Sequence, residues 1–212
     1  MNYSADDFLG TTLNIFDLHI NGYPVFVFIW NIALAVLTVL LAYWVVKVWQ
    51  SKQFWLKKLG IFIVWLAFFP NAAYLMTDAR HVIGYCPIGS YGRVCPDNAW
   101  MALFFFAYAA LGWPALVFSL KPLKDFVVKS YGKIYGLIFT LVMCFLAALG
   151  ILLGLLNRFN SWEIIYKPIN IIKAALIYFY DSTAALNLLI IFLVLFFLYI
   201  LGEKIFITPK VK

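Results

Sequence analysis

The feature that most restricts this chain is a series of five apolar runs, each long enough to cross a bilayer as a helix. A transmembrane helix needs about 20 mostly apolar residues. The chain of 212 residues is 66% hydrophobic and 12% charged, which is more apolar surface than one soluble core hides. We therefore predict an all-α, polytopic transmembrane helix bundle that forms a single integral membrane domain over residues 1–212. The predicted spans are residues 24–46, 59–77, 99–120, 134–156 and 185–207.

A sixth apolar segment, residues 168–180, is too short to span and is interrupted by Asn170 and Lys173. We interpret it as an interfacial or re-entrant helix. The alternative is a sixth span. A sixth span would move the C-terminal lysines to the other side of the membrane, against the distribution of basic residues.

Basic residues are concentrated in alternate gaps between the runs. Eleven lysines follow the first, third and fifth runs, whereas five basic residues follow the second and fourth. The richer side is normally cytoplasmic. We therefore expect a multi-pass protein of the plasma or inner membrane, with its N-terminus extracytoplasmic and its C-terminus cytoplasmic.

The lipid bilayer is its expected partner, with anionic lipids at the cytoplasmic lysines. Because the net charge of +7 is spread over short gaps, we expect no nucleic-acid partner. The cytoplasmic set is Lys47, Lys52, Lys57, Lys58, Lys121, Lys124, Lys129, Lys133, Lys204, Lys210 and Lys212.

Two cysteines, Cys86 and Cys95, lie in the turn-rich gap after the second run. In an oxidising compartment, a disulfide between them is the natural pairing. A metal site that includes His81 is the alternative, although it lacks a fourth ligand, and two free thiols are the third reading. The disulfide is the interpretation that we favour.

Polar residues follow one face of the second run. Asn71, Tyr74, Asp78 and His81 are separated by three, four and three residues. At 100° per residue on an α-helix, they fall within an arc of about 80°. Pro70 removes a backbone donor at the start of this stripe, so we expect a kink there.

The fourth run carries a complementary face of small residues, with Gly150 and Gly154 in a Gly-x-x-x-Gly pair that lets another helix approach. Polar residues follow at its outer end, from Asn157 to Glu163. We therefore expect the polar ends of the second and fourth runs to share an extracytoplasmic pocket. An ion pair of Arg158 with Asp78 or Glu163 would lower the cost of these charges near lipid.

The polar cluster has both structural and functional readings. The structural ones are cross-helix hydrogen bonds, an ion pair, a hydrogen-bonded histidine and an interfacial Trp162. The functional one is a site in which Asp78, His81 or Glu163 would be catalytic. A metal held by His81, Asp78 and His19 is a weaker alternative, and no cofactor is assigned. The ligand-binding candidates are Asn71, Tyr74, Asp78, His81, Arg158, Asn160, Trp162 and Glu163.

Two segments resemble signatures of a family of bacterial membrane proteins, domain of unknown function 1361. The first is FFPNAAYLMTDARH, residues 68–81, in which Ala73 replaces the proline usual in the family. The second is RFNSWE, residues 158–163, with Glu163 in place of an aspartate. The first run, from Trp30, is also similar. The resemblance implies a polytopic membrane protein over about residues 28–190, and it implies no particular activity.

Three classes of function remain open. The first is an extracytoplasmic site for a small ligand, a lipid head group or a metal. As an enzyme, such a protein would be a hydrolase or transferase, with Asp78 or His81 as base and Arg158 holding an anionic group. The second is a structural or assembly protein whose motifs lock helices together. The third, a small transporter, is less favoured because five spans show no inverted repeat.

Overall fold

The protein is a helical bundle with one short hairpin before its first long helix. The computed structural model describes residues 19–20, 23–82 and 100–207. Strands β1 (His19–Ile20) and β2 (Tyr23–Pro24) pair antiparallel. The helices are α1 (Val25–Gln50), α2 (Trp55–Tyr74), the 3₁₀ helix η2 (Leu75–Val82), α3 (Trp100–Ala110), α4 (Gly112–Tyr131), α5 (Lys133–Leu155), α6 (Glu163–Tyr166), α7 (Pro168–Tyr180) and α8 (Ser182–Phe206).

Within the described residues, five helical stretches are long and apolar enough to cross a membrane, so the predicted fold class is confirmed. They are Val25–Gln50, Trp55–Arg80, Ala102–Tyr131, Lys133–Leu155 and Ser182–Phe206. The chain is therefore a multi-pass membrane protein that has the lipid bilayer as its solvent. Helix α7 has 13 residues. At 1.5 Å per residue it is about 20 Å long, shorter than a hydrocarbon core of about 30 Å.

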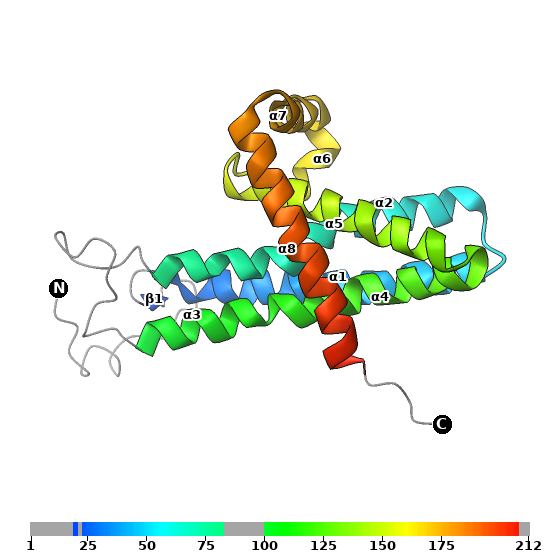
Figure 1. Cartoon of the computed structure of the whole chain (residues 1–212), viewed down its shortest axis with the longest axis horizontal. Coiled ribbons are helices and arrows are strands. Elements are labelled where there is room, and N and C mark those ends of the chain that lie inside the picture. The colour runs from blue at the N-terminus through cyan, green and yellow to red at the C-terminus, as the bar shows by residue number, and fades with distance from the viewer. Residues whose placement is uncertain (1–18, 21–22, 83–99, 208–212) are drawn as a thin grey trace.

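Helices α1, α2, α4 and α5 run side by side, and α8 crosses them steeply (Figure 1). The core between them includes fully buried Trp65, Phe69 and Leu116. Helix α8 is fixed to α4 by the indole Nε1 of Trp113, which donates to the backbone oxygen of Leu198 at 2.7 Å. Because Gly202 has no side chain, this indole can approach the helix closely.

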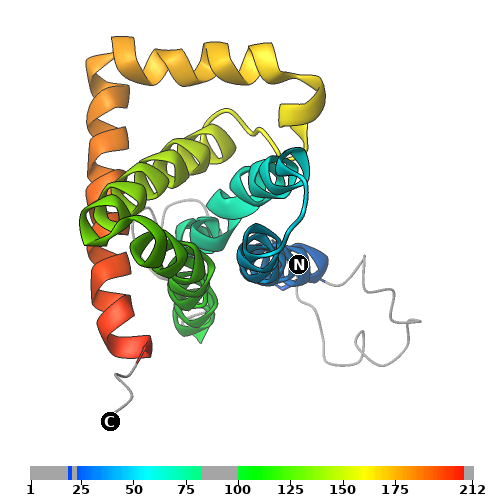
Figure 2. The same cartoon turned by 90° about the vertical axis from the view of Figure 1, so that its right-hand side faces the viewer.

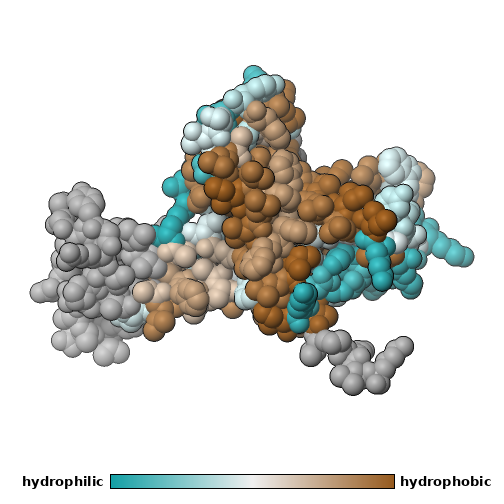
Figure 3. All heavy atoms as spheres, in the orientation of Figure 1, coloured by the Kyte–Doolittle hydropathy of each residue, from teal (hydrophilic) through white to brown (hydrophobic). Residues whose placement is uncertain are grey.

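The turns that connect α1 to α2 and α4 to α5 lie at the same end of the bundle (Figure 1). The second turn is Gly132 alone, whose φ of 102° is accessible mainly to glycine. Exposed lysines surround both turns, and hydrophilic residues gather at this end beside an apolar middle (Figure 3). Helix α7 lies along one flank of the bundle, between its two ends, and continues through a sharp corner into α8 (Figure 2).

The second span changes helix type, which the sequence pattern did not predict. The α-helix ends at Tyr74, and η2 continues with i to i+3 geometry. The hydroxyl of Thr77 donates to the Tyr74 backbone oxygen at 2.7 Å, and this short local bond supports the tighter turn. Since a 3₁₀ helix turns about 120° per residue, residues beyond Tyr74 do not follow the spacing of one α-helical face. Asn71, Tyr74 and Asp78 nevertheless line one cavity.

Candidate functional site

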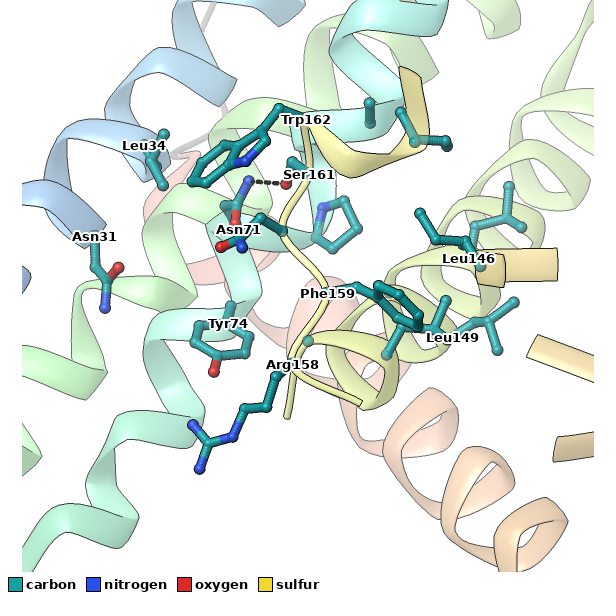
Figure 4. Close-up of a pocket in the computed structure, with 18 of the residues that line it drawn as sticks. Asn31, Leu34, Asn71, Tyr74, Leu146, Leu149, Arg158, Phe159, Ser161 and Trp162 are labelled. Carbon is teal, nitrogen blue, oxygen red and sulfur yellow. Dashed lines mark hydrogen bonds between the residues drawn. The ribbon is translucent and has the colours of Figure 1, made fainter. Parts of the chain in front are cut away.

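A cavity of about 670 Å³ lies between α1, α2, α5 and the segment that runs from α5 through α6 to α7 (Figure 4). Its volume is in the range typical of small-molecule sites. Both segments that carry the family-like motifs contribute to its wall. Its polar lining residues are Asn31, Asn71, Tyr74, Asp78, Arg80, Arg158, Asn160, Ser161 and Trp162.

The two motif segments contact each other directly at the cavity. The side-chain amide of Asn71 donates to the hydroxyl of Ser161 at 2.8 Å and to the Phe68 backbone oxygen at 3.1 Å. Below this bond, a Cβ on Gly150 would lie 2.3 Å from the ring of Pro70. A Cβ on Gly154 would lie 3.1 Å from the ring of Tyr74. The two glycines therefore let α5 approach α2 at the residues that carry the polar stripe.

The loop after α5 reverses the chain at Arg158, which has a φ of 60°. This left-handed conformation is uncommon for a residue with a β-carbon and often occurs at functional positions. The turn is closed by the backbone N–H of Phe159, which donates to the Leu153 oxygen at 3.2 Å. Helix α7 is attached to the same loop by the Tyr178 hydroxyl, which donates to Asn157 Oδ1 at 2.9 Å.

Glu163 serves this loop as a local acceptor. Its carboxylate accepts from the backbone N–H of Asn160 at 2.7 Å and from Lys167 Nζ at 2.9 Å. The Asn160 hydrogen bond and the Lys167 ammonium lower the pKa of Glu163 below its ordinary value of 4.5. Both interactions favour the ionised carboxylate, so Glu163 is an anion that fixes the start of α6.

Arg158 does not form the ion pair that the sequence suggested. Its side chain is exposed, and within residues 23–82 and 100–207 it makes no hydrogen bond or salt bridge. The expected pairing with Asp78 or Glu163 is therefore wrong for this structure. The reason is geometric, because Glu163 is satisfied by its own loop and Asp78 faces other helices. Figure 4 shows the Arg158 side chain extending from the loop toward the part of α2 that carries Tyr74.

Asp78 is 1% exposed and is held by residues that the sequence reasoning missed. Its Oδ2 accepts from Asn31 Nδ2 at 3.0 Å and from the Tyr108 hydroxyl at 3.2 Å. Both donors come from apolar spans, α1 and α3. An asparagine within such a span needs a partner because burying an unpaired amide is costly, and this signal was present in the sequence.

Four of the predicted site residues lie wholly or partly outside the described structure. Cys86 and Cys95 lie outside the described residues, so their disulfide stays a prediction. The backbones of His19 and His81 are placed in β1 and η2, but their side chains lie outside what the structure describes. Over the described part of the chain, no three histidine, cysteine, aspartate or glutamate side chains form a metal-binding group.

The polar residues of the cavity wall gather on one side, where apolar residues also lie, and the other side is apolar. Asn31, Tyr74 and Arg158 lie on the first side of the loop together with Leu34 (Figure 4). Phe159 and the leucines of α5 lie on the other side (Figure 4). Helix α7 continues this second side, and the apolar lining residues there are Leu146, Leu149, Phe159, Ile171, Ile172 and Ala175. A molecule that fills the whole space therefore needs one polar and one apolar part.

The fold and this cavity define a class of protein, a multi-pass helical membrane protein with an amphipathic cavity beside its helix bundle. The chain belongs to the family described as "Protein of unknown function (DUF1361)", whose pattern matches residues 30–201. The resemblance drawn from the two motifs is thereby confirmed. Comparison with curated proteins and with solved structures gave no match.

Proposed function

We propose that this protein binds an amphiphilic molecule of the membrane in the cavity between α1, α2, α5 and α7. The observation that carries the proposal is that the polar groups of the cavity wall gather on one side, opposite an apolar side. A head group would lie among Asn31, Tyr74 and Arg158, and an acyl or prenyl chain would lie along Leu149 and Ile171. Because the chain of a membrane amphiphile is already in hydrocarbon, its affinity for this side would come from packing contacts and not from the hydrophobic effect.

The proposed orientation places the lysine-rich turns at the cytoplasmic side and the N-terminus outside. The exposure of Lys52, Lys57, Lys129 and Lys133 around the α1–α2 and α4–α5 turns supports it. These lysines would contact anionic lipids there. In this orientation, in a plasma or inner membrane, the polar side of the cavity belongs to the extracytoplasmic half of the protein.

A structural role for part of the motifs is the second candidate. The Asn71–Ser161 hydrogen bond and the contact of Gly150 with Pro70 support it, because both hold α5 and its loop against α2. The two roles are compatible, since a rigid junction keeps a binding cavity in shape.

The proposal is tested with a phospholipid that carries a photoreactive group on its acyl chain. In the purified full-length protein, we expect cross-links on the α5 and α7 sides of the cavity, suppressed by an excess of unlabelled lipid. Leu149→Trp fills the apolar side and should abolish these cross-links. Val142→Trp, at an exposed position on the same helix outside the cavity lining, is the matched control and should keep them. The site would be refuted if the cross-links were unchanged in Leu149→Trp and lay on the outer surface of the helices.

A further inference from the structure

The charged residues of the cavity wall are unequal in sign. Arg80 and Arg158 contribute two guanidinium groups, and Asp78 contributes one carboxylate. This carboxylate accepts hydrogen bonds from Asn31 and Tyr108 in the adjacent helices. Of the two guanidinium groups, that of Arg158 makes no hydrogen bond or ion pair with the described residues. Such an arginine at the border of a largely apolar cavity favours an anionic ligand.

Arg158 is the cation that is most available to such a ligand. Within the residues that the structure describes, its guanidinium has no protein partner, although it borders the cavity. The strained φ of 60° directs the side chain away from the helical path of α5. A guanidinium binds phosphate or carboxylate through two parallel hydrogen bonds.

A second donor faces the same space from a different element. The ring of Tyr74 packs against Gly154, which holds the hydroxyl on the polar side of the cavity. In the described structure no hydrogen bond joins this hydroxyl to another residue. Tyr74 and Arg158 thus approach from α2 and from the loop. Both groups are hydrogen-bond donors, and a phosphate has several oxygens that can accept from two elements at once.

The geometry points to a phosphate as the head group of the bound amphiphile, held by the guanidinium of Arg158 and the hydroxyl of Tyr74. This inference rests on the proposed function, since the cavity must first hold an amphiphile. A lipid head group and free inorganic phosphate share this chemistry. The apolar side of the cavity favours the lipid.

The test compares competitors of the photoreactive lipid on the full-length protein in a neutral detergent. The competitors are dioleoyl phosphatidic acid, dioleoyl glycerol, oleate and inorganic phosphate. Phosphatidic acid should compete roughly tenfold more strongly than dioleoyl glycerol, as the loss of a charge-assisted hydrogen bond implies. Arg158→Gln should remove this preference. Lys173→Gln, which removes an exposed cation of α7 outside the cavity lining, should retain it.

Arg158→Gly separates binding from folding, because glycine adopts the left-handed backbone readily and has no guanidinium. This variant should keep the melting temperature of the protein and lose the phosphate preference. Equal competition by phosphatidic acid, dioleoyl glycerol and oleate would refute the inference that the head group is a phosphate, but it would leave the proposed amphiphile site intact. Competition by inorganic phosphate alone would overturn the lipid origin of the group. If none of the lipids competes with the photoreactive lipid, the proposed function itself is refuted.

Discussion

The side-chain amide of Asn71 donates a 2.8 Å hydrogen bond to the hydroxyl of Ser161, which lies 90 residues further along the chain. This bond joins the two segments that carry the family-like motifs. It also closes one side of the cavity, where Asn71 and Ser161 both line the wall (Figure 4).

Removing this bond should loosen the junction of α2 with the loop. We expect Ser161→Ala to lower the free energy of unfolding in detergent by about 1 kcal/mol, the usual net value of a hydrogen bond. In an Asn71→Ala background, the same change should cost much less, because the partner is already absent. Ser130→Ala, at an exposed site on α4, is the control. Additive costs in the double mutant would show that the bond does not stabilise the junction.

Gly150 permits the contact of α5 with α2, and its replacement should be costly. A Cβ there would lie 2.3 Å from Cγ and 2.7 Å from Cβ of Pro70, whose ring has little freedom to move. We expect Gly150→Ala to destabilise the protein by about 1–3 kcal/mol through overpacking. Gly60→Ala on α2 meets no atom within 4 Å and should be neutral or stabilising, because alanine favours helix. Equal melting temperatures for both variants would contradict the contact.

The carboxylate of Asp78 should stabilise the contact of η2 with α3 through Tyr108. We expect Tyr108→Phe to cost about 1 kcal/mol, the usual net value of a hydrogen bond. The cost should largely disappear in an Asp78→Ala background, which chemical denaturation of the four proteins in the cycle would measure. Tyr135→Phe, at a residue 60% exposed on α5, should change stability little. If Tyr108→Phe lowers the free energy of unfolding as much in the Asp78→Ala background as in the wild type, the loss comes from packing and not from the hydrogen bond.

The lowered pKa of Glu163 predicts that the loop between α5 and α6 loses stability in acid. This pKa is lowered in the folded protein by the backbone N–H of Asn160 and by Lys167. A lowered pKa stabilises the fold at every pH above the ordinary value of 4.5, and this stabilisation is lost as the pH falls through the folded value. Melting temperatures should therefore drop below about pH 4.5 more steeply in the wild type than in Glu163→Gln. Parallel pH profiles would show that the carboxylate does not contribute.

The helical class and the number of long apolar helices could be predicted from the sequence because hydrophobic length is a local property. A run of about 20 apolar residues specifies a span whatever it packs against. The Gly-x-x-x-Gly pair is local in the same sense, and the structure places it where two helices meet closely. The family-like motifs were also readable as contiguous segments.

The partners of the polar residues were decided by tertiary structure. The sequence alone suggested an ion pair of Arg158 with Asp78 or Glu163. The change from α2 to η2 turns Asp78 toward Asn31 and Tyr108 instead. The left-handed turn at Arg158 directs its guanidinium into the cavity wall. The hydrogen bonds of Asp78 join residues 30 or more positions apart, and a residue pattern within one helix does not specify which residues of other helices it meets.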